Sequence, residues 1–260
     1  MFAEERRIRI CEMLNEKNTV QLGELAALFQ TSTETIRRDL LDLERKGCLQ
    51  RIHGGAISVS RMVRVKELSQ RISEFQDRKR ELSGYAAEMI QEGDTIAVDS
   101  GSTAIAFIRE AAGRFGNLTV VTHSLDVTEI LRNFPDIQTI LCGGRYLPAE
   151  NAFYGDFTLD MLNRLHVDKA FLFPSAISVR GGIMDYNYEL LQIQRNYLKI
   201  SDRIFFLADS SKFEKSARLK LDDLHPEYTV VTDSFLSDEV FSFYEENNVK
   251  IIRGKEQIPT

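Results

Sequence analysis

The stretch STETIRRDLLDLERKGCLQRIHGGA, from Ser32 to Ala56, joins a helical pattern to a Gly-Gly turn. Ile36, Leu40 and Leu43 recur at i, i+4 and i+7, and this spacing predicts a helix with one apolar stripe against a core. Because each residue turns the helix by about 100°, Arg38 falls almost opposite that stripe. The stretch therefore predicts a helix that points basic side chains outward and is followed by a tight turn.

Both ends of this helix carry recognisable signals. Ser32 precedes the periodic run and can cap the helix, whereas Thr31 with Glu34 three residues later offers an alternative capping box. Gly47 is the expected C-cap, because glycine readily adopts the left-handed conformation that ends many helices. Upstream, Arg6 to Glu16 and Glu24 to Phe29 predict two shorter helices. The three-residue gap before the basic helix is typical of a helix-turn-helix.

A hairpin is expected directly after the basic helix. Cys48 to Ile52 predicts a strand, and the His53-Gly54-Gly55 turn can adopt positive φ angles before Ala56 and Ile57 return. Such a hairpin would be the wing of a winged helix-turn-helix, and we expect the basic helix and the wing to contact duplex DNA. The expected DNA-contacting residues are Ser32, Thr33, Thr35, Arg37, Arg38, Arg51, His53, Gly54 and Gly55.

A basic helix is often only a solvated surface, but the motif here is more specific. TIRRDLLDLERKG followed by RIHGGA closely resembles the N-terminal signature of the DeoR family of bacterial transcriptional regulators, without a gap from about Arg6 to Ile57. The resemblance implies a transcriptional regulator that binds operator DNA. It also implies that the regulator is a repressor and that its effector releases it from DNA.

The length of the chain suggests two domains. A chain of 260 residues can hold a small N-terminal domain and a second domain of ordinary size. We expect residues 1–57 to form a winged helix-turn-helix domain, residues 58–80 a linker that is either a helix or an extended arm, and residues 81–260 an α/β domain for effector sensing and oligomerisation. The N-terminus lacks the apolar core of a signal peptide, and no apolar run could span a bilayer, so a cytoplasmic protein without membrane contact is expected.

Charge is divided unevenly along the chain. Residues 1–80 hold 16 Lys and Arg against 12 Asp and Glu, a net charge of +4, whereas residues 81–260 hold 17 against 27, a net charge of −10. A modest positive charge argues against strong non-specific affinity for DNA. Specific binding is therefore expected to depend on the geometry of a homodimer or homotetramer.

Cysteines and histidines give no metal signal. Cys11, Cys48 and Cys142 are scattered, which is typical of reduced thiols. No pair of histidines and no Cys-His pair has metal-ligand spacing, so the sequence predicts neither a metal site nor a cofactor.

From Glu81 onward, strand-like and helix-like runs alternate. The expected strands are near-continuously apolar, which is typical of a mainly parallel sheet covered by helices on both faces. In such a sheet the ligand crevice lies beyond the C-terminal ends of the strands. The expected strands are Thr95–Asp99, Leu118–Thr122, Ile137–Cys142, Lys169–Phe173, Ile204–Ala208 and Tyr228–Thr232, and the expected helices are Ser102–Ala112, Ser124–Asn133 and Glu189–Ile200.

Polar and glycine-rich loops follow several of these strands. Backbone N–H groups and hydroxyls at the start of a helix can hold an anion, and a lysine near the same edge could pair with it. The loops and the lysine suggest a phosphorylated sugar as the effector, because no dinucleotide or P-loop motif is present. The expected effector-binding residues are Asp99, Ser100, Gly101, Ser102, Thr103, Thr122, His123, Ser124, Gly143, Gly144 and Lys212.

Simpler interpretations of these residues remain open. Ser102 and Ser124 could merely cap helices, and the glycines could merely form turns. His123 could be a satisfied polar residue, and Lys212 an ordinary surface lysine. The alternative function is a sugar-phosphate isomerase, in which Asp99, Glu189 and Lys212 would supply acid, base and charge stabilisation.

The second half of the chain also resembles the DeoR family. GDTIAVDSGST, LTVVTHS and LADSSKF look like the effector-binding domain of these regulators, which is similar in fold to ribose-5-phosphate isomerase. The resemblance covers about Glu81 to Ser234 and implies that the DSGST loop, Ser124 and Lys212 line the effector pocket. His123 stands where the family usually has Asn, and Pro174 where Gly is common, which leaves the particular effector open.

Overall fold

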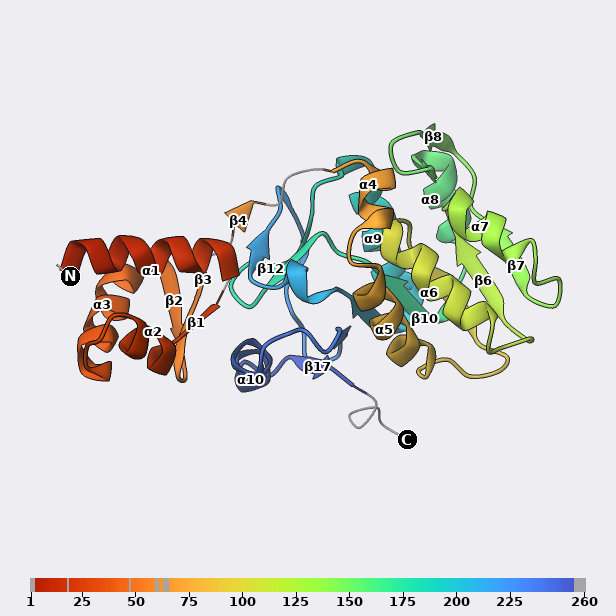
Figure 1. The fold of residues 1–260 in the computed structure, drawn as a ribbon. Coiled ribbons are helices and arrows are strands. Elements are labelled where there is room, and N and C mark those ends of the chain that lie inside the picture. Colours follow the sequence, from red (N-terminus) through yellow and green to blue (C-terminus); the bar gives the residue numbers. More distant parts are fainter. Residues whose placement is uncertain (1–2, 18, 47, 59–60, 63–65, 255–260) are drawn as a thin grey trace.

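The computed structural model describes residues 3–17, 19–46, 48–58, 61–62 and 66–254. Figure 1 shows a small N-terminal unit joined to a larger unit that contains a wide sheet. We call residues 3–58 the head and residues 66–254 the body. Residues 61–62 lie between them.

The head is a winged helix-turn-helix. Its third helix packs on the first two helices, and its strands form an antiparallel sheet in the order β1-β3-β2. The wing predicted from sequence is the β2–β3 hairpin, whereas β1 was not predicted. The elements are α1 (Ala3–Lys17), β1 (Thr19–Gln21), α2 (Leu22–Leu28), α3 (Thr33–Arg45), β2 (Leu49–Ile52) and β3 (Gly55–Ser58).

Helix α3 confirms the apolar stripe expected from the sequence. Ile36, Leu40 and Leu43 are buried in the head core. Ser32 is the N-cap, because its hydroxyl accepts a hydrogen bond from the Thr35 N–H at 3.2 Å. The C-cap of α3 is Lys46. The expected C-cap, Gly47, lies outside the described residues.

Glycine is required at the two wing positions for different structural reasons. Gly54 has a φ of 89°, a conformation that favours glycine, and it forms the turn with His53. Of the three residues expected to form the turn, Gly54 adopts a positive φ angle, whereas His53 and Gly55 do not. A Cβ on Gly55 would stand 2.1 Å from the Val20 carbonyl oxygen, so Gly55 allows β3 to approach β1.

Three elements follow the head before the body sheet begins. Strand β4 (Arg61–Met62) pairs in parallel with β14 (Lys215–Ser216) of the body. Helix α4 (Leu68–Ser73) and helix α5 (Gln76–Ala87) come next, and α5 packs against α6 (Ser102–Ala112). Helix α5 continues across residue 80, where the linker was predicted to end. The division into residues 1–57, 58–80 and 81–260 therefore stays a prediction.

The body contains a seven-stranded sheet among its described residues, and every pairing in it is parallel. The strand order is β17-β16-β13-β10-β5-β6-β7. All six strands predicted from sequence are present, and β17 joins them at one edge. The strands are β5 (Thr95–Val98), β6 (Thr119–Thr122), β7 (Gln138–Leu141), β10 (Val167–Leu172), β13 (Ser201–Leu207), β16 (Thr229–Val231) and β17 (Lys250–Ile252).

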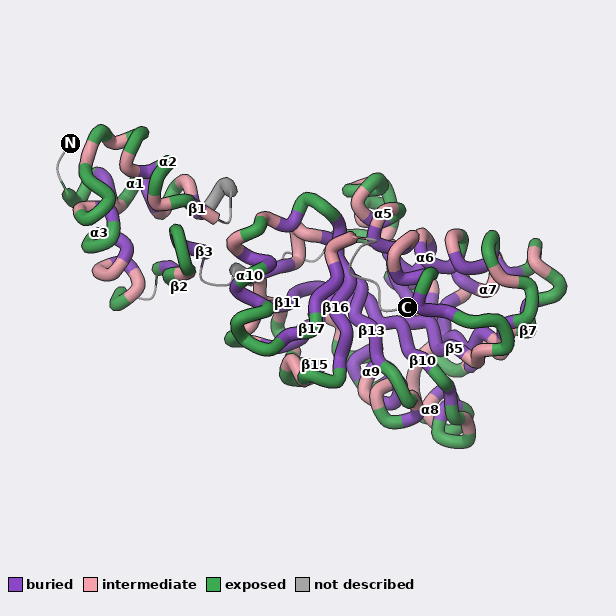
Figure 2. The backbone as a smooth tube through the Cα atoms, turned by 90° about the horizontal axis from the view of Figure 1, so that it is seen from below, coloured by how far each residue is buried: buried purple, intermediate pink, exposed green. Residues whose placement is uncertain are grey.

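Alternate residues of these strands enter two separate cores. Ile96 and Val98 pack with α5 and α6, whereas Ala97 between them packs with the helices of the opposite face. In the same way, Phe205 and Phe206 enter opposite cores. Figure 2 shows the inner strands buried between two helical layers whose outer surfaces are exposed. The near-continuous apolar runs of the sequence are therefore explained by burial on both faces.

The remaining elements cover the sheet and extend its loops. Helices α5, α6 and α7 lie on one face of the sheet, and α8 and α9 lie on the other (Figures 1 and 2). The three helices predicted for the body are present as α6, α7 and α9. The further elements are α7 (Leu125–Leu131), β8 (Arg145–Leu147), β9 (Ala152–Tyr154), α8 (Asp156–Leu162), β11 (Ala176–Ser178), β12 (Gly182–Asp185), α9 (Tyr188–Ile200), the short 3₁₀ helix η1 (Ser210–Lys212), β15 (Leu219–Asp222) and α10 (Asp238–Glu246).

The strand order defines where a ligand crevice can form. From β5 the chain builds the sheet outward through β6 and β7, and then returns to the other side of β5 with β10. The direction of building therefore reverses between β5 and β10. In open parallel sheets, the crevice beyond the strand C-termini lies at such a reversal.

Candidate functional site

The outward surface of α3 presents the expected basic side chains. The side chains of Arg37 and Arg38 are 62% and 79% exposed. Their only described ionic partner is Glu34, at 3.6 Å and 3.8 Å, distances too long for firm hydrogen bonds. Ser32 and Thr33 are also exposed, and Thr35 is half-buried. Both guanidinium groups are thus accessible to a partner.

A buried ion-pair network holds α3 against α1. Asp39 is 2% exposed, and its carboxylate accepts hydrogen bonds from Arg6 Nε at 2.6 Å and Arg7 Nε at 2.8 Å. This network was not predicted from sequence. Its signal was an acidic residue three positions after Ile36, on the apolar side of α3.

The wing is tied to the C-terminal end of α3. Glu44 accepts hydrogen bonds from the backbone and the side chain of Arg51, both at 2.8 Å. Burial alone would raise the pKa of Glu44, but these hydrogen bonds outweigh burial and lower that pKa. His53 and Gly54 are exposed at the tip of the wing, whereas Gly55 is buried. Arg51 therefore serves the structure of the wing, and Gly55 serves its packing.

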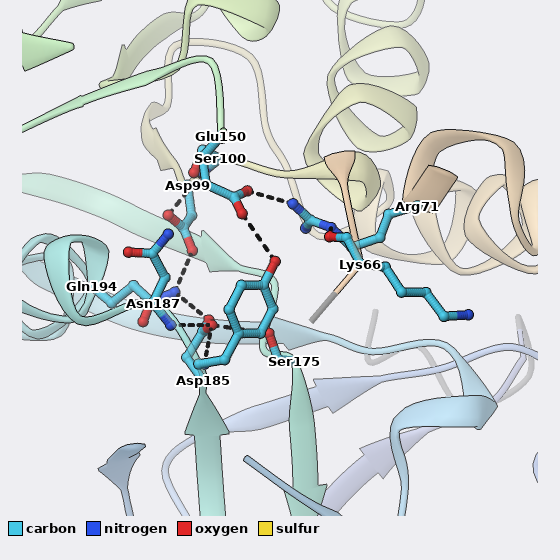
Figure 3. A network of polar contacts seen from close by, with 10 residues as sticks. Lys66, Arg71, Asp99, Ser100, Glu150, Ser175, Asp185, Asn187 and Gln194 are labelled. Carbon is cyan, nitrogen blue, oxygen red and sulfur yellow. Dashed lines mark hydrogen bonds and ion pairs between the residues drawn. The ribbon is translucent and has the colours of Figure 1, made fainter. Parts of the chain in front are cut away.

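A buried polar cluster lies at the reversal point of the body sheet (Figure 3). Asp99, directly after β5, is 1% exposed. Its Oδ1 accepts a hydrogen bond from Ser100 N at 2.8 Å and lies 3.0 Å from His123 Nε2. Its Oδ2 accepts from Gln194 Nε2 at 3.0 Å, and the same nitrogen donates to Asp185 Oδ2 at 2.9 Å. Residues from four distant segments thus form one network.

Two residues of this cluster, Asp185 and Gln194, have unusual surroundings. Asp185 also accepts from the Ser175 hydroxyl at 2.9 Å and from Tyr186 N at 2.6 Å, and burial raises its pKa. Gln194 Oε1 is buried and has no hydrogen-bond partner in the described part of the chain. An unpartnered buried carbonyl oxygen is costly, so a ligand that donates a hydrogen bond to it would be favoured.

A second group of polar side chains closes the cluster from outside. Arg71 of α4 reaches Glu150 of the β8–β9 loop, with Nη2 to Oε2 at 2.5 Å. Tyr186 donates to the other Glu150 oxygen at 2.9 Å, and the Arg71 guanidinium lies 5.7 Å from the Tyr186 ring centre. Behind this group is a small cavity of about 20 Å³, and in front of it is a cleft of about 620 Å³.

The expected residues of the β6 loop lie inside the protein. Thr122, His123 and Ser124 are each fully buried. Thr122 Oγ1 donates to Val98 O at 2.8 Å, and Ser124 caps α7 by accepting from Val127 N at 3.3 Å. His123 Nδ1 lies 2.8 Å from Phe153 O. These side chains therefore hold the loops around Asp99 in place.

The DSGST loop opens α6 beside the cavity. Gly101, not Ser102, is the N-cap of α6, and Gly101 has a φ of 116°. Ser100 lines the small cavity, Ser102 is half-buried and Thr103 is buried. The loop therefore brings the N-terminus of an eleven-residue helix to the crevice, where its backbone N–H groups favour an anion.

The remaining expected residues lie outside the cluster. Thr158 Oγ1 donates to Gly143 O at 3.1 Å, and a Cβ on Gly144 would stand 2.2 Å from the same hydroxyl oxygen. Gly144 therefore allows α8 to pack closely, whereas a Cβ on Gly143 would meet nothing within 4 Å. Lys212 is half-buried in η1. Burial lowers the pKa of Lys79 to about 8, and the charge of Lys212 contributes to that lowering.

Several residues of the site were missed by sequence reasoning. Gln194 had a readable signal, because it is a polar residue on the buried side of α9, between Leu190 and Tyr197. Asp185 ends β12, a strand that was not predicted. Arg71 and Glu150 had no signal, since only the fold brings α4 to the β8–β9 loop.

The described ranges show neither a metal centre nor a membrane segment. No group of three or more His, Cys, Asp and Glu side chains in them is arranged to hold a metal ion. No described helix combines the length and the apolarity that a membrane span requires.

The fold and the two sites define a class of protein. An exposed basic helix in a winged head, joined to a body with a polar crevice at its sheet reversal, is typical of a DNA-binding regulator that responds to a small molecule. Comparison with protein families supports this class. The DeoR-like helix-turn-helix domain matches residues 6–62, and the DeoR C terminal sensor domain matches residues 74–234. The chain belongs to the DeoR family, and it is a DNA-binding transcriptional regulator.

Characterised relatives cover nearly the whole chain. The transcriptional repressor AccR of Agrobacterium fabrum is 33% identical over 89% of this chain and 90% of its own length. The L-fucose operon activator of Haemophilus influenzae is 33% identical over 94% of this chain and 97% of its own length. The glycerol-3-phosphate regulon repressor of Escherichia coli is 28% identical over 88% of this chain and 90% of its own length.

Among solved structures, ribose 5-phosphate isomerase A of Neisseria gonorrhoeae shows a partial likeness. It is 17% identical, with a TM-score of 0.39, and the likeness covers 53% of each chain. A likeness this limited says nothing about activity.

Proposed function

We propose that this chain is a repressor of carbohydrate genes whose operator binding is controlled by a phosphorylated sugar. Its relatives include two named repressors and one named activator, and two of these names refer to L-fucose or glycerol 3-phosphate. The proposed direction is that the effector releases the repressor from DNA. In this proposal the protein has no catalytic residue and needs no cofactor.

The observation that carries the effector proposal is the unpartnered Gln194 Oε1 beside two buried carboxylates. All of these atoms accept hydrogen bonds, so they select a ligand with several hydroxyl donors. The N-terminus of α6, at the same crevice, favours a phosphate. A phosphorylated sugar has both features in one small molecule.

The proposed DNA contacts come from the head. Arg37 and Arg38 would reach guanine edges or phosphates in the major groove, and His53 and Gly54 at the wing tip would contact the backbone or the minor groove. Two heads of a homo-oligomer would read two half-sites one helical turn apart. The net charge of +4 in residues 1–80 is too small for strong non-specific affinity for DNA. This supports a dependence on two symmetric heads.

The test is a binding assay with the full chain and a duplex from its own upstream promoter region. We expect preference over scrambled duplex at moderate salt, and release by one member of a panel of pentose, hexose and triose phosphates. Lys212→Ala should keep the DNA affinity and lose the response to that sugar phosphate. Equal binding to both duplexes would contradict the proposal. Conversion of a panel member at enzyme-like rates would favour the isomerase alternative.

A further inference from the structure

Arg71 of helix α4 lines the inner cavity of the body crevice. Arg71 Nη1 lies 3.7 Å from where a Cβ on Gly101 would stand, so the guanidinium covers the N-terminus of α6. Figure 3 shows Arg71 reaching from α4 toward Glu150, beside Ser100. The proposed effector site thus includes a residue from the segment that connects it to the DNA-binding head.

The position of Arg71 needs a negative partner. A guanidinium at a helix N-terminus places two positive charges together, and this is unfavourable without an anion. Glu150 is that anion, because its carboxylate pairs with Arg71 at 2.5 Å and is 5% exposed. The carboxylate is fixed from its other side by the Tyr186 hydroxyl at 2.9 Å.

The Arg71–Glu150 pair also stands between two spaces. Glu150 and Tyr186 line both the inner cavity of about 20 Å³ and the outer cleft of about 620 Å³. The inner cavity, at about 20 Å³, has room for about one water molecule, so a phosphate group enters it only if its walls move. Arg71 and Glu150 are among the walls of this cavity, so a phosphate that enters it beside Ser100 would displace the pair.

Displacement of Arg71 would move a braced segment. Lys66 Nζ pairs with Glu74 at 2.7 Å, and Arg71 Nε donates to Lys66 O at 3.2 Å. Lys79 Nζ donates to the carbonyl oxygens of Arg71 and Glu74, which joins α4 to the start of α5. Residues 66–79 lie between the head and the body sheet along the chain.

We propose that Glu150 is an internal substitute for the anionic group of the effector. The effector phosphate takes the Arg71 guanidinium from Glu150, and α4 moves with Arg71. This inference rests on the proposed function, and it adds a residue pair and a route for the signal. A ligand can shift the equilibrium between two states only by contacts that differ between them, and the exchanged partner of Arg71 supplies such a difference.

Binding of inorganic phosphate, measured by thermal shift and calorimetry on the full chain, tests the inference. Glu150→Gln removes the competing charge and keeps the shape, so we expect phosphate to bind about tenfold more tightly than in the wild type. Arg71→Ala should weaken phosphate binding at least about tenfold, and Arg71→Lys should restore part of it. Glu129→Gln and Arg132→Ala alter an exposed pair on and beside α7 and should change nothing.

If the Arg71–Glu150 ion pair is only structural, Glu150→Gln will not tighten phosphate binding. Unchanged or weaker phosphate binding in a folded Glu150→Gln protein would overturn the inference. If Glu150→Gln does not fold, Tyr186→Phe removes the hydrogen bond that fixes Glu150, and it should tighten phosphate binding less but in the same direction.

Failure of the inference differs from failure of the proposed function. A wild type that releases DNA with a sugar phosphate, together with an Arg71→Ala protein that responds equally well, would overturn only the role of Arg71. A wild type that responds to neither phosphate nor any phosphorylated sugar would overturn both.

Discussion

The basic surface of the head and the polar cluster of the body use charge in opposite ways. Arg37 and Arg38 are exposed and only loosely paired, so they can meet DNA without breaking an internal contact. Asp99, Asp185 and Gln194 are buried and bonded to one another, so a ligand there must fit among contacts that already exist. From this difference we expect that affinity for DNA depends on geometry between heads, whereas the response to a ligand depends on competition inside the body.

The largest change in stability is expected at Asp39, because its charge is buried in the head. Asp39→Ala leaves Arg6 buried without its partner and should destabilise the head by about 3–5 kcal/mol. Denaturant unfolding of the full chain measures this loss. Operator binding reports on the folded head, and phosphate binding reports on the folded body. Glu34→Ala, an exposed change on the same helix, should cost less than about 0.5 kcal/mol. Equal effects of the two changes would remove the contrast between buried and exposed charge.

The matching change in the body is Gln194→Met. It removes the donor shared by Asp99 and Asp185 and should destabilise the body by about 1–3 kcal/mol. Operator affinity should stay at the wild-type value, while the response to the sugar phosphate is lost. A Gln194→Met protein that keeps its response would show that the cluster does not contact the ligand.

Arg38→Ala tests the exposed side of the comparison. Loss of a bidentate contact to a base should weaken operator affinity by about 1–3 kcal/mol, without a change in the unfolding free energy. Fluorescence anisotropy at several salt concentrations measures the effect. Arg132→Ala, on an equally exposed arginine beside α7, is the control and should leave the affinity unchanged. Unchanged binding by Arg38→Ala would remove Arg38 from the contact surface.

The smallest effect concerns the pH dependence of the body. Burial lowers the pKa of Lys79 to about 8 from the ordinary value of 10.5, so between these pH values the unfolded chain binds more protons than the folded chain. Stability from this group therefore rises with pH across that window, by on the order of 1 kcal/mol. Lys79→Met should lack this rise when unfolding free energies at pH 8 and pH 10 are compared. Parallel pH profiles of the two proteins would contradict the prediction.

Local sequence signals predicted most of the fold. Apolar periodicity located α3, and apolar runs located six strands of the body sheet, because each of these elements buries its own residues. Strand β17 and the sheet of β11, β12 and β15 were missed, since these strands have only three or four residues each.

For a related reason, only some residues of the candidate site could be predicted from the sequence. Asp99 and Ser100 follow an apolar strand directly, and that position identifies them. Arg71, Glu150 and Asp185 belong to segments that have no regular pattern of their own. Their proximity is a product of chain topology, which a linear pattern does not contain.

The strand order has a consequence for how the molecule is made. The head is formed by residues 3–58 and the body by residues 66–254, so the head can fold first during synthesis. The body sheet receives its edge strand β17 from residues 250–252, so β16 keeps an open side until those residues have been made. We predict that stalled chains of increasing length acquire a protease-resistant head long before a resistant body. During that interval a nascent chain would have its operator-reading part complete and its sensing part unformed.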